Sequence, residues 1–167
     1  DIPFYISGEI PNYIDAFFET VSGFTTTGST ILNDIEALSR GMLFWRCFTH
    51  WIGGMGVLVF VLALIPKSEG QDMFLMKAEV PGPVVGKLVS KVHMTARILY
   101  GIYAFLTVIE IIFLLFGGMP LFDSIVHAFS TAGTGGYAIK NSSIAFYNSY
   151  YIDMVVTVFM LLFGINF

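Results

Sequence analysis

Residues 15–31 read DAFFETVSGFTTTGSTI and residues 123–139 read DSIVHAFSTAGTGGYAI, so one pattern occurs twice in the chain. The two stretches are offset by 108 residues, and five of their seventeen positions are identical, Gly28 and Gly136 among them. Each copy is a short apolar segment that leads into a loop rich in threonine and glycine, and a long apolar segment follows. In a hydrophobic chain, this repeat predicts a re-entrant helix followed by a loop of exposed backbone carbonyls.

The composition is that of a membrane protein. Hydrophobic residues make up 56% of the chain and charged residues 12%, against about 25% charged residues in soluble domains. With a mean hydropathy of +0.77, the chain has too few charges to cover a soluble fold. The single cysteine, Cys47, excludes a disulfide within the chain. Because the chain begins in a loop-like stretch and stops inside an apolar run, we expect an internal piece of a longer protein.

Five apolar segments predict an all-α membrane fold. Three of them, residues 42–65, 98–116 and 150–167, are long enough to cross about 30 Å of hydrocarbon. The other two, residues 13–24 and 121–132, reach only roughly 18 Å as helices. Such short helices suit a position buried in the protein or dipping into the membrane from one side.

Both short segments carry helix start signals. Asn12 can cap the first, with Asp15 three residues later as a variant of the capping box. Pro120 fits the first turn of the second, with Asp123 near its N-terminus. We interpret the two aspartates as structural residues at helix starts rather than as groups that attract ions.

The distribution of lysine and arginine predicts the topology. These residues concentrate at 66–97 and are absent from residues 1–39, so the positive-inside rule makes 66–97 cytoplasmic and turns both loops outward. Residues 1–65 then hold a re-entrant helix, a loop and an inward span, and residues 66–97 form a cytoplasmic connector. Residues 98–167 form a complete unit of span, re-entrant helix, loop and span.

The two loops have the composition that a cation filter of backbone oxygens needs. Glycine permits positive φ and carries no side chain to block an axis, and Gly28 and Gly136 provide one in each copy. The carbonyl ends of the short helices favour a cation. Neither loop contains a carboxylate, which favours a monovalent cation over calcium. The candidate ligands are the backbone carbonyls of Thr26, Thr27, Gly28, Thr134, Gly135 and Gly136.

Several segments together carry a family resemblance. FETVSGFTTTGST (residues 18–30), WRCFTHWIGGMGVLV (45–59), TARILYGIY (95–103), FDSIVHAFSTAGTGGYA (122–138) and the closing GINF follow one another in order. Over essentially its whole length the chain resembles the Trk/Ktr/HKT superfamily of potassium transporters. The resemblance is greatest to the membrane subunit of the bacterial Trk potassium uptake system.

The resemblance implies potassium uptake, with symporter activity, across the cytoplasmic membrane. It implies a pseudo-fourfold pore of four span–pore helix–span repeats, of which this chain holds two, the first incomplete. It also implies a homodimer and a cytoplasmic nucleotide-binding regulatory subunit (TrkA-like). Relatives with serine at the first filter glycine tend to admit sodium, so Gly28 favours potassium as the transported ion.

Three alternatives remain open at this point. The first is a sodium-permeable or non-selective cation transporter of the same superfamily. The second is a membrane-embedded enzyme, which would need titratable groups converging at one depth, and neither loop carries any. The third is a membrane scaffold, which has no need of re-entrant glycine loops. We therefore expect a transporter and not an enzyme.

Arg46 and Glu110 are charged and fall well inside predicted spans. Arg46 and Glu110 lie at similar depth from the outer face, and buried charges at such depth usually pair. We expect an Arg46–Glu110 pair that braces the outer half of the pore; the alternatives are Arg46 reaching outward or pairing with Asp15 or Glu19. His50 shares a helix face with Gly53 and Gly54, which predicts close contact with a re-entrant helix and a hydrogen-bonded packing role for the histidine.

Overall fold

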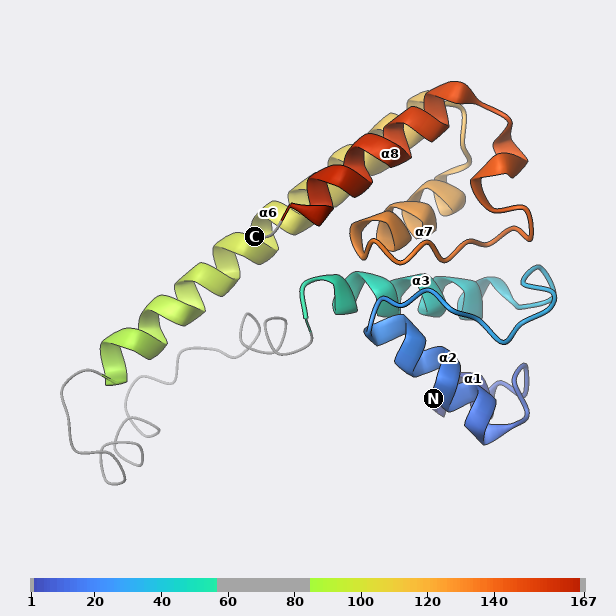
Figure 1. Ribbon diagram of the computed structural model, residues 1–167, viewed down its shortest axis with the longest axis horizontal. Helices are drawn as coiled ribbons and strands as arrows, with labels where there is room; N and C mark the ends of the chain where they lie inside the picture. Colours follow the sequence, from blue (N-terminus) through green and yellow to red (C-terminus); the bar gives the residue numbers. More distant parts are fainter. Residues whose placement is uncertain (1, 57–84, 166–167) are drawn as a thin grey trace.

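The computed structural model describes residues 2–56 and 85–165, and every regular element within them is helical (Figure 1). The elements are α1 (Ile2–Ile6), α2 (Tyr13–Phe24), α3 (Arg40–Gly54), α6 (Val85–Phe116), α7 (Leu121–Ala132), the 3-10 helix η1 (Ser143–Tyr147) and α8 (Tyr150–Gly164). The expectation of an all-α fold is confirmed for these residues.

The two short helices begin and end where the sequence predicts them. Helices α2 and α7 have 12 residues each, and the offset of the repeat carries one onto the other. Asn12 caps α2, because its side chain accepts a hydrogen bond from the backbone amide of Ile14 at 3.0 Å. Pro120 occupies the corresponding cap of α7. Asp15 and Asp123 lie in the first turns, where a carboxylate interacts favourably with the helix dipole.

The long helix α6 differs from its prediction at its start. It begins at Val85 rather than at residue 98, so the second part of the expected connector is continuous with the span. The sequence between Pro83 and Pro120 contains no proline, and nothing there interrupts a helix. Residues 66–84 of the expected connector lie outside the described residues.

One helix of the described ranges is long and apolar enough to cross a membrane. It is the part of α6 from Met94 to Phe116, with 23 residues and a mean hydropathy of 2.3. Helix α8 is apolar but has 15 residues, with residues 166–167 outside the description. Helix α3 covers the first part of the span expected at 42–65, and residues 57–65 are likewise outside the description.

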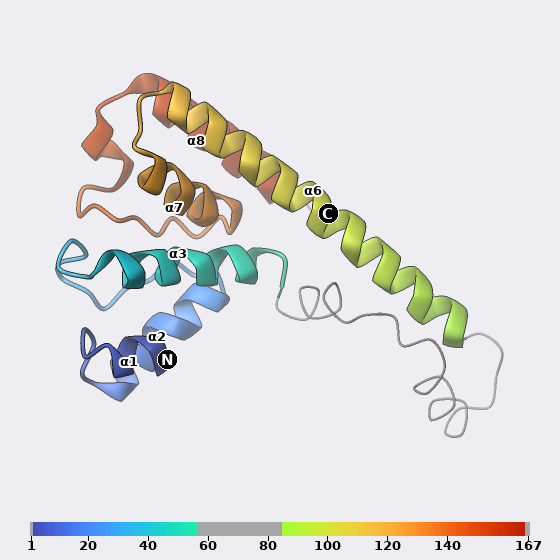
Figure 2. The same ribbon diagram turned by 180° about the vertical axis from the view of Figure 1, so that it is seen from behind.

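The helices stack in an order that places α7 at the centre. Helices α6 and α8 lie side by side, and α7 packs against both of them (Figure 1). On its other side α7 contacts α3, and α3 in turn contacts α2, so that α3 lies between the two re-entrant helices (Figure 2).

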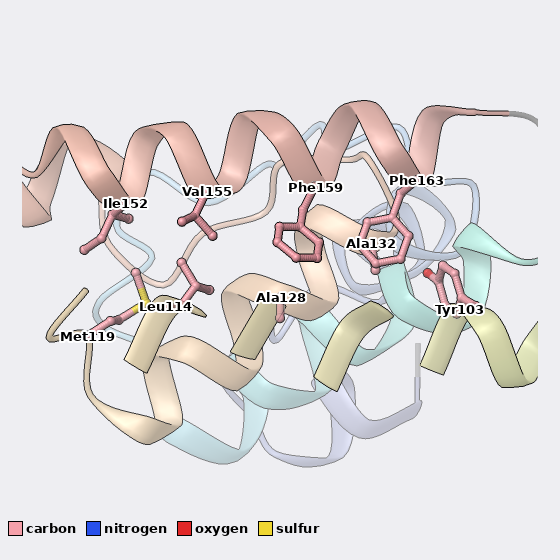
Figure 3. Packing of buried hydrophobic residues seen from close by; sticks show 9 residues of the cluster. All are labelled: Tyr103, Leu114, Met119, Ala128, Ala132, Ile152, Val155, Phe159 and Phe163. Carbon is pink, nitrogen blue, oxygen red and sulfur yellow. The ribbon is translucent and has the colours of Figure 1, made fainter. Parts of the chain in front are cut away.

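Two apolar clusters hold this stack together. Along α8, four buried side chains recur at helical spacing and point toward α6 and α7 (Figure 3). They are Ile152, Val155, Phe159 and Phe163. The second cluster joins the two copies of the repeat, because Leu43 and Cys47 of α3 pack with Val126 of α7. A stacked, shared core fixes the two loops that follow α2 and α7 relative to each other.

Candidate ion-binding loops

The loops that follow α2 and α7 lie against each other. A Cβ atom added to Gly28 would overlap the carbonyl oxygen of Gly135, so the backbones of the two loops are in contact there. Tyr137 crosses the same boundary and donates its hydroxyl proton to the carbonyl of Ser29 at 3.1 Å. The structure therefore brings together the two loops that the sequence repeat singles out.

The two loops have the same backbone conformation. Thr26 and Thr134 both have a φ of 54°, a left-handed conformation that is uncommon for threonine. Gly28 and Gly136 follow with φ of 76° and 79°, where glycine is favoured because it has no Cβ. At the position of Gly28 and Gly136, glycine is therefore the residue that adopts the observed φ without strain.

The amide groups of both loops point back toward the helices. The amides of Thr26 and Thr27 donate to the carbonyls of Gly23 and Ser22 at 3.1 and 3.0 Å. The equivalent amides of the second loop, those of Thr134 and Gly135, donate to the equivalent carbonyls of α7 at 2.8 and 3.4 Å. Loop amides held in this way satisfy the last carbonyls of each helix.

The carbonyl oxygens of the loops have no such partners. In the part of the chain that the structure describes, no donor forms a hydrogen bond to the carbonyls of the six candidate ligands. Gly136 and Thr134 are exposed and Gly28 and Gly135 are half-buried, so these oxygens lie at the edge of the packed structure. Unpaired carbonyls near a surface are available to replace water around a cation.

Threonine and serine hydroxyls support the first loop. Thr25 donates to the carbonyl of Val21 at 2.7 Å, and its hydroxyl lies 2.8 Å from that of Thr27. Ser22, the serine that both copies share, donates to the carbonyl of Ser29 at 2.6 Å and holds the far end of this loop.

The predicted pair between Arg46 and Glu110 is wrong. Arg46 Nε donates to Glu19 Oε1 at 2.5 Å, and both side chains are buried. This is one of the alternatives weighed from the sequence. It prevails because Glu19 lies on α2, which packs directly on the part of α3 that carries Arg46.

Glu110 is buried without an ionic partner. Its side chain is fully buried in α6, and among the described residues no hydrogen bond within normal distances reaches either carboxyl oxygen. The hydroxyl of Thr131 in α7 is its polar neighbour. Asp123 is placed differently, since it accepts a hydrogen bond of 2.6 Å from the hydroxyl of Tyr147 and so ties η1 to the start of α7.

The glycine face of α3 makes the close contacts that its spacing predicts. A Cβ atom on Gly53 would overlap the backbone of Phe24, and one on Gly54 would lie 2.9 Å from Gly133 Cα. His50 is fully buried on the same face, and its ring lies against that of Tyr137 with 3.9 Å between the centroids and 58° between the planes. The histidine is packed as predicted, but the predicted hydrogen bond is wrong, because no donor or acceptor in the described residues pairs with its ring nitrogens.

Sequence reasoning missed Tyr137 and Ala138 and gave Glu19 only as an alternative. Tyr137 follows the second loop and binds the first, and Ala138 accepts a hydrogen bond from Arg46. A signal was present for Glu19, because it is the one acidic residue in the middle of a re-entrant helix. Nothing in the sequence indicates which backbone carbonyl a distant arginine will bind.

These features define a class of protein. A membrane-length helix together with two equivalent loops of free carbonyls, in a chain whose described elements are all helical, is typical of helical membrane proteins that pass cations. The chain belongs to the TrkH family of cation transport proteins, whose family model matches residues 1–167. This is a family of transporters and not of enzymes.

Individual relatives agree with this assignment. The chain is 40% identical to the Trk system potassium uptake protein TrkH of Salmonella typhimurium and to that of Escherichia coli K12, over 99% of its own length. It is 38% identical to the Trk system potassium uptake protein TrkG of Escherichia coli K12. The chain spans about a third of these relatives, 35% of each TrkH and 34% of TrkG.

A solved structure has the same fold. The crystal structure of the potassium transporter TrkH from Vibrio parahaemolyticus superposes with a TM-score of 0.67 and 34% sequence identity. The match covers 89% of this chain and 28% of that one.

Proposed function

We propose that this chain supplies two of the carbonyl loops of a potassium-selective uptake pathway. A potassium ion loses water against the backbone oxygens of residues 26–28 and 134–136, together with matching loops from the rest of the protein. One observation carries the proposal: two touching loops share one backbone conformation and leave the carbonyls of all six residues without a protein donor.

Potassium is favoured over other cations for three reasons. The candidate ligands are neutral carbonyls, which suit an ion of low charge density better than calcium. The relatives at 40% identity are potassium uptake proteins by name. Glycine rather than serine stands at residue 28. A sodium-permeable or non-selective transporter is the second candidate.

The setting of this pathway follows from the family. We place the chain in the cytoplasmic membrane as part of a multi-pass protein with potassium symporter activity. Residues 1–65 and 98–167 contribute to two successive repeats, and residues 66–97 form the connector between them on the cytoplasmic side. A homodimer and a nucleotide-binding regulator on that side complete the expected assembly.

The test is ion uptake by the full-length protein in cells that lack their own potassium uptake systems. We expect Gly28→Ser and Gly136→Ser to reduce potassium uptake relative to sodium uptake by about tenfold or more, or roughly 1.4 kcal/mol of discrimination. The reason is that both glycines have positive φ, which a serine adopts only with strain, so the adjoining carbonyls are displaced.

The matched control is Gly101→Ala. Gly101 lies in α6 with nothing within 4 Å of an added Cβ atom, and we expect it to leave uptake unchanged. Normal growth on low potassium with both filter substitutions would remove the assignment of the loops. Equal uptake of sodium and potassium by the unmodified protein would favour the second candidate.

A further inference from the structure

A buried ion pair connects the far ends of the two loops. Arg46 is 1% exposed and Glu19 is 1% exposed, so the pair is closed off from solvent. Arg46 belongs to α3 and Glu19 to α2, and neither residue is among the loop residues themselves.

On one side, Glu19 holds the end of the first loop. Its two carboxyl oxygens accept the hydroxyl proton of Thr30 at 3.0 Å each, and Oε2 also accepts the backbone amide of Ile31 at 3.2 Å. Ser29 separates these two residues from Gly28 in the chain. Charge-assisted hydrogen bonds of this kind are stronger than bonds between neutral groups.

On the other side, Arg46 holds the end of the second loop. Its Nη1 donates to the carbonyl of Ala138 at 3.0 Å, and its guanidinium carbon lies 3.6 Å from the centre of the Tyr137 ring. The hydroxyl of that tyrosine donates to the carbonyl of Glu19 at 3.2 Å as well as to that of Ser29. Both loop ends therefore contact one buried pair.

The second copy of the repeat has no such pair. The residue equivalent to Glu19 is His127, and the residue equivalent to Arg46 is Met154. The ion pair is therefore not part of the pattern that the two copies share. It belongs to the first copy and joins that copy to the second. Burying two charges costs several kcal/mol unless their hydrogen bonds are satisfied, so the geometry of this network is tightly constrained.

We propose that Glu19 and Arg46 are positioning residues that fix the separation of the two loops and thereby set the discrimination between potassium and sodium. This inference rests on the proposed function. The pair does not touch the ion. It acts through Thr30, Ile31 and Ala138, which hold the loop backbones that would contact it.

The experiment measures rubidium and sodium uptake by the full-length protein and compares two ion-pair variants with a surface control. Glu19→Gln removes the charge with little change of shape. Arg46→Lys keeps the charge. A single ammonium group, however, lacks the planar set of N–H donors with which arginine binds Glu19 and Ala138 at the same time. We expect both to lower the rubidium-to-sodium ratio by about tenfold while uptake itself persists.

The control is Lys140→Met, which breaks an exposed ion pair to Glu36 between the same two copies. Because exposed pairs contribute little, we expect it to leave the ratio unchanged. Tyr137→Phe provides an independent variant that leaves the ion pair in place and removes the hydroxyl bonds to Ser29 and Glu19. We expect it to lower the ratio in the same direction, and it decides the matter if Glu19→Gln does not accumulate in the membrane.

Reduced uptake with an unchanged ratio in Arg46→Lys and Tyr137→Phe would show a merely structural role and overturn the inference. Gly28→Ser is measured beside them to separate the two proposals. If Gly28→Ser changes the ratio and the pair variants do not, the inference fails and the proposed function stands. If Gly28→Ser leaves the ratio unchanged, the proposed function itself fails.

Discussion

Two buried glutamates have opposite environments. Glu19 accepts hydrogen bonds from an arginine, a threonine and a backbone amide, whereas the carboxyl of Glu110 has no cation beside it in the described part of the chain. A buried ion that has lost its partner costs several kcal/mol, and a buried neutral group costs much less. The same residue type is therefore expected to respond differently to the same substitution.

We expect Glu110→Gln to be tolerated and Glu19→Gln to be costly. Glutamine has the shape of glutamate and can keep a polar contact to Thr131, so the free energy of unfolding should change by less than about 1 kcal/mol at Glu110. At Glu19 the arginine would be left buried and unpaired, at a cost of about 3 kcal/mol or more. Thermal unfolding of the full-length protein in detergent checks both. A larger loss at Glu110 than at Glu19 would contradict the argument.

At the scale of elements, the sequence predicts the short helices better than the long ones. Their bounds follow from local signals, such as Asn12 and Pro120 at the starts and the glycine-rich loops at the ends. The predicted start of α6 is too late, because the charges of residues 66–97 favour a separate cytoplasmic connector although nothing after Pro83 breaks a helix. The start of a helix that has no capping residue cannot be located from a local sequence signal.

Close packing between elements can be tested at glycines of α3 and α6. A Cβ atom on Gly54 would overlap the hydroxyl of Tyr103 and lie 2.9 Å from the Cα of Gly133, and a backbone atom cannot move away cheaply. We expect Gly54→Ala to destabilise the protein by about 1–3 kcal/mol through overpacking. The midpoint of thermal unfolding is the measurement.

Gly101→Ala is the matched substitution in a helix without such contact. With open space around it, the added methyl group lowers the entropy lost on folding and should stabilise the protein by about 0.5–1 kcal/mol. Destabilisation at Gly101 as large as that at Gly54 would mean that packing against α7 is not the cause.

At the scale of the whole molecule, the contacts between the two repeats were not predictable. The repeat itself indicates two equivalent loops, but it does not indicate that they touch or which residues join them. Asn141 binds both the amide of Ile35 and the carboxylate of Asp34, at 2.8 Å each, across more than a hundred residues. Such bonds depend on how α3 and α7 stack, which is a property of the folded core and not of any local pattern.

The outermost of these contacts gives a pH-dependent prediction. Glu36 accepts hydrogen bonds from Lys140 Nζ at 3.0 Å and from the amide of Asn141 at 3.3 Å. The bond from Lys140, followed by that from Asn141, lowers the pKa of Glu36 below its ordinary value of 4.5. A carboxyl whose pKa is lower in the folded state stabilises that state above the ordinary pKa, and this contribution is lost as the pH falls through the lowered value.

We therefore expect the full-length protein to melt at a slightly higher temperature than its Glu36→Gln variant at neutral pH, with the difference disappearing below pH 4.5. The difference should be small, because the Glu36 side chain is 42% exposed, and should shrink further in high salt, which screens the ammonium group of Lys140. Lys140→Met should remove the larger part of it, since the amide of Asn141 still binds the carboxylate. A difference that grows as the solution is acidified would have the wrong sign for a carboxylate stabilised in its ionised form, and would show that this contact does not link the two repeats.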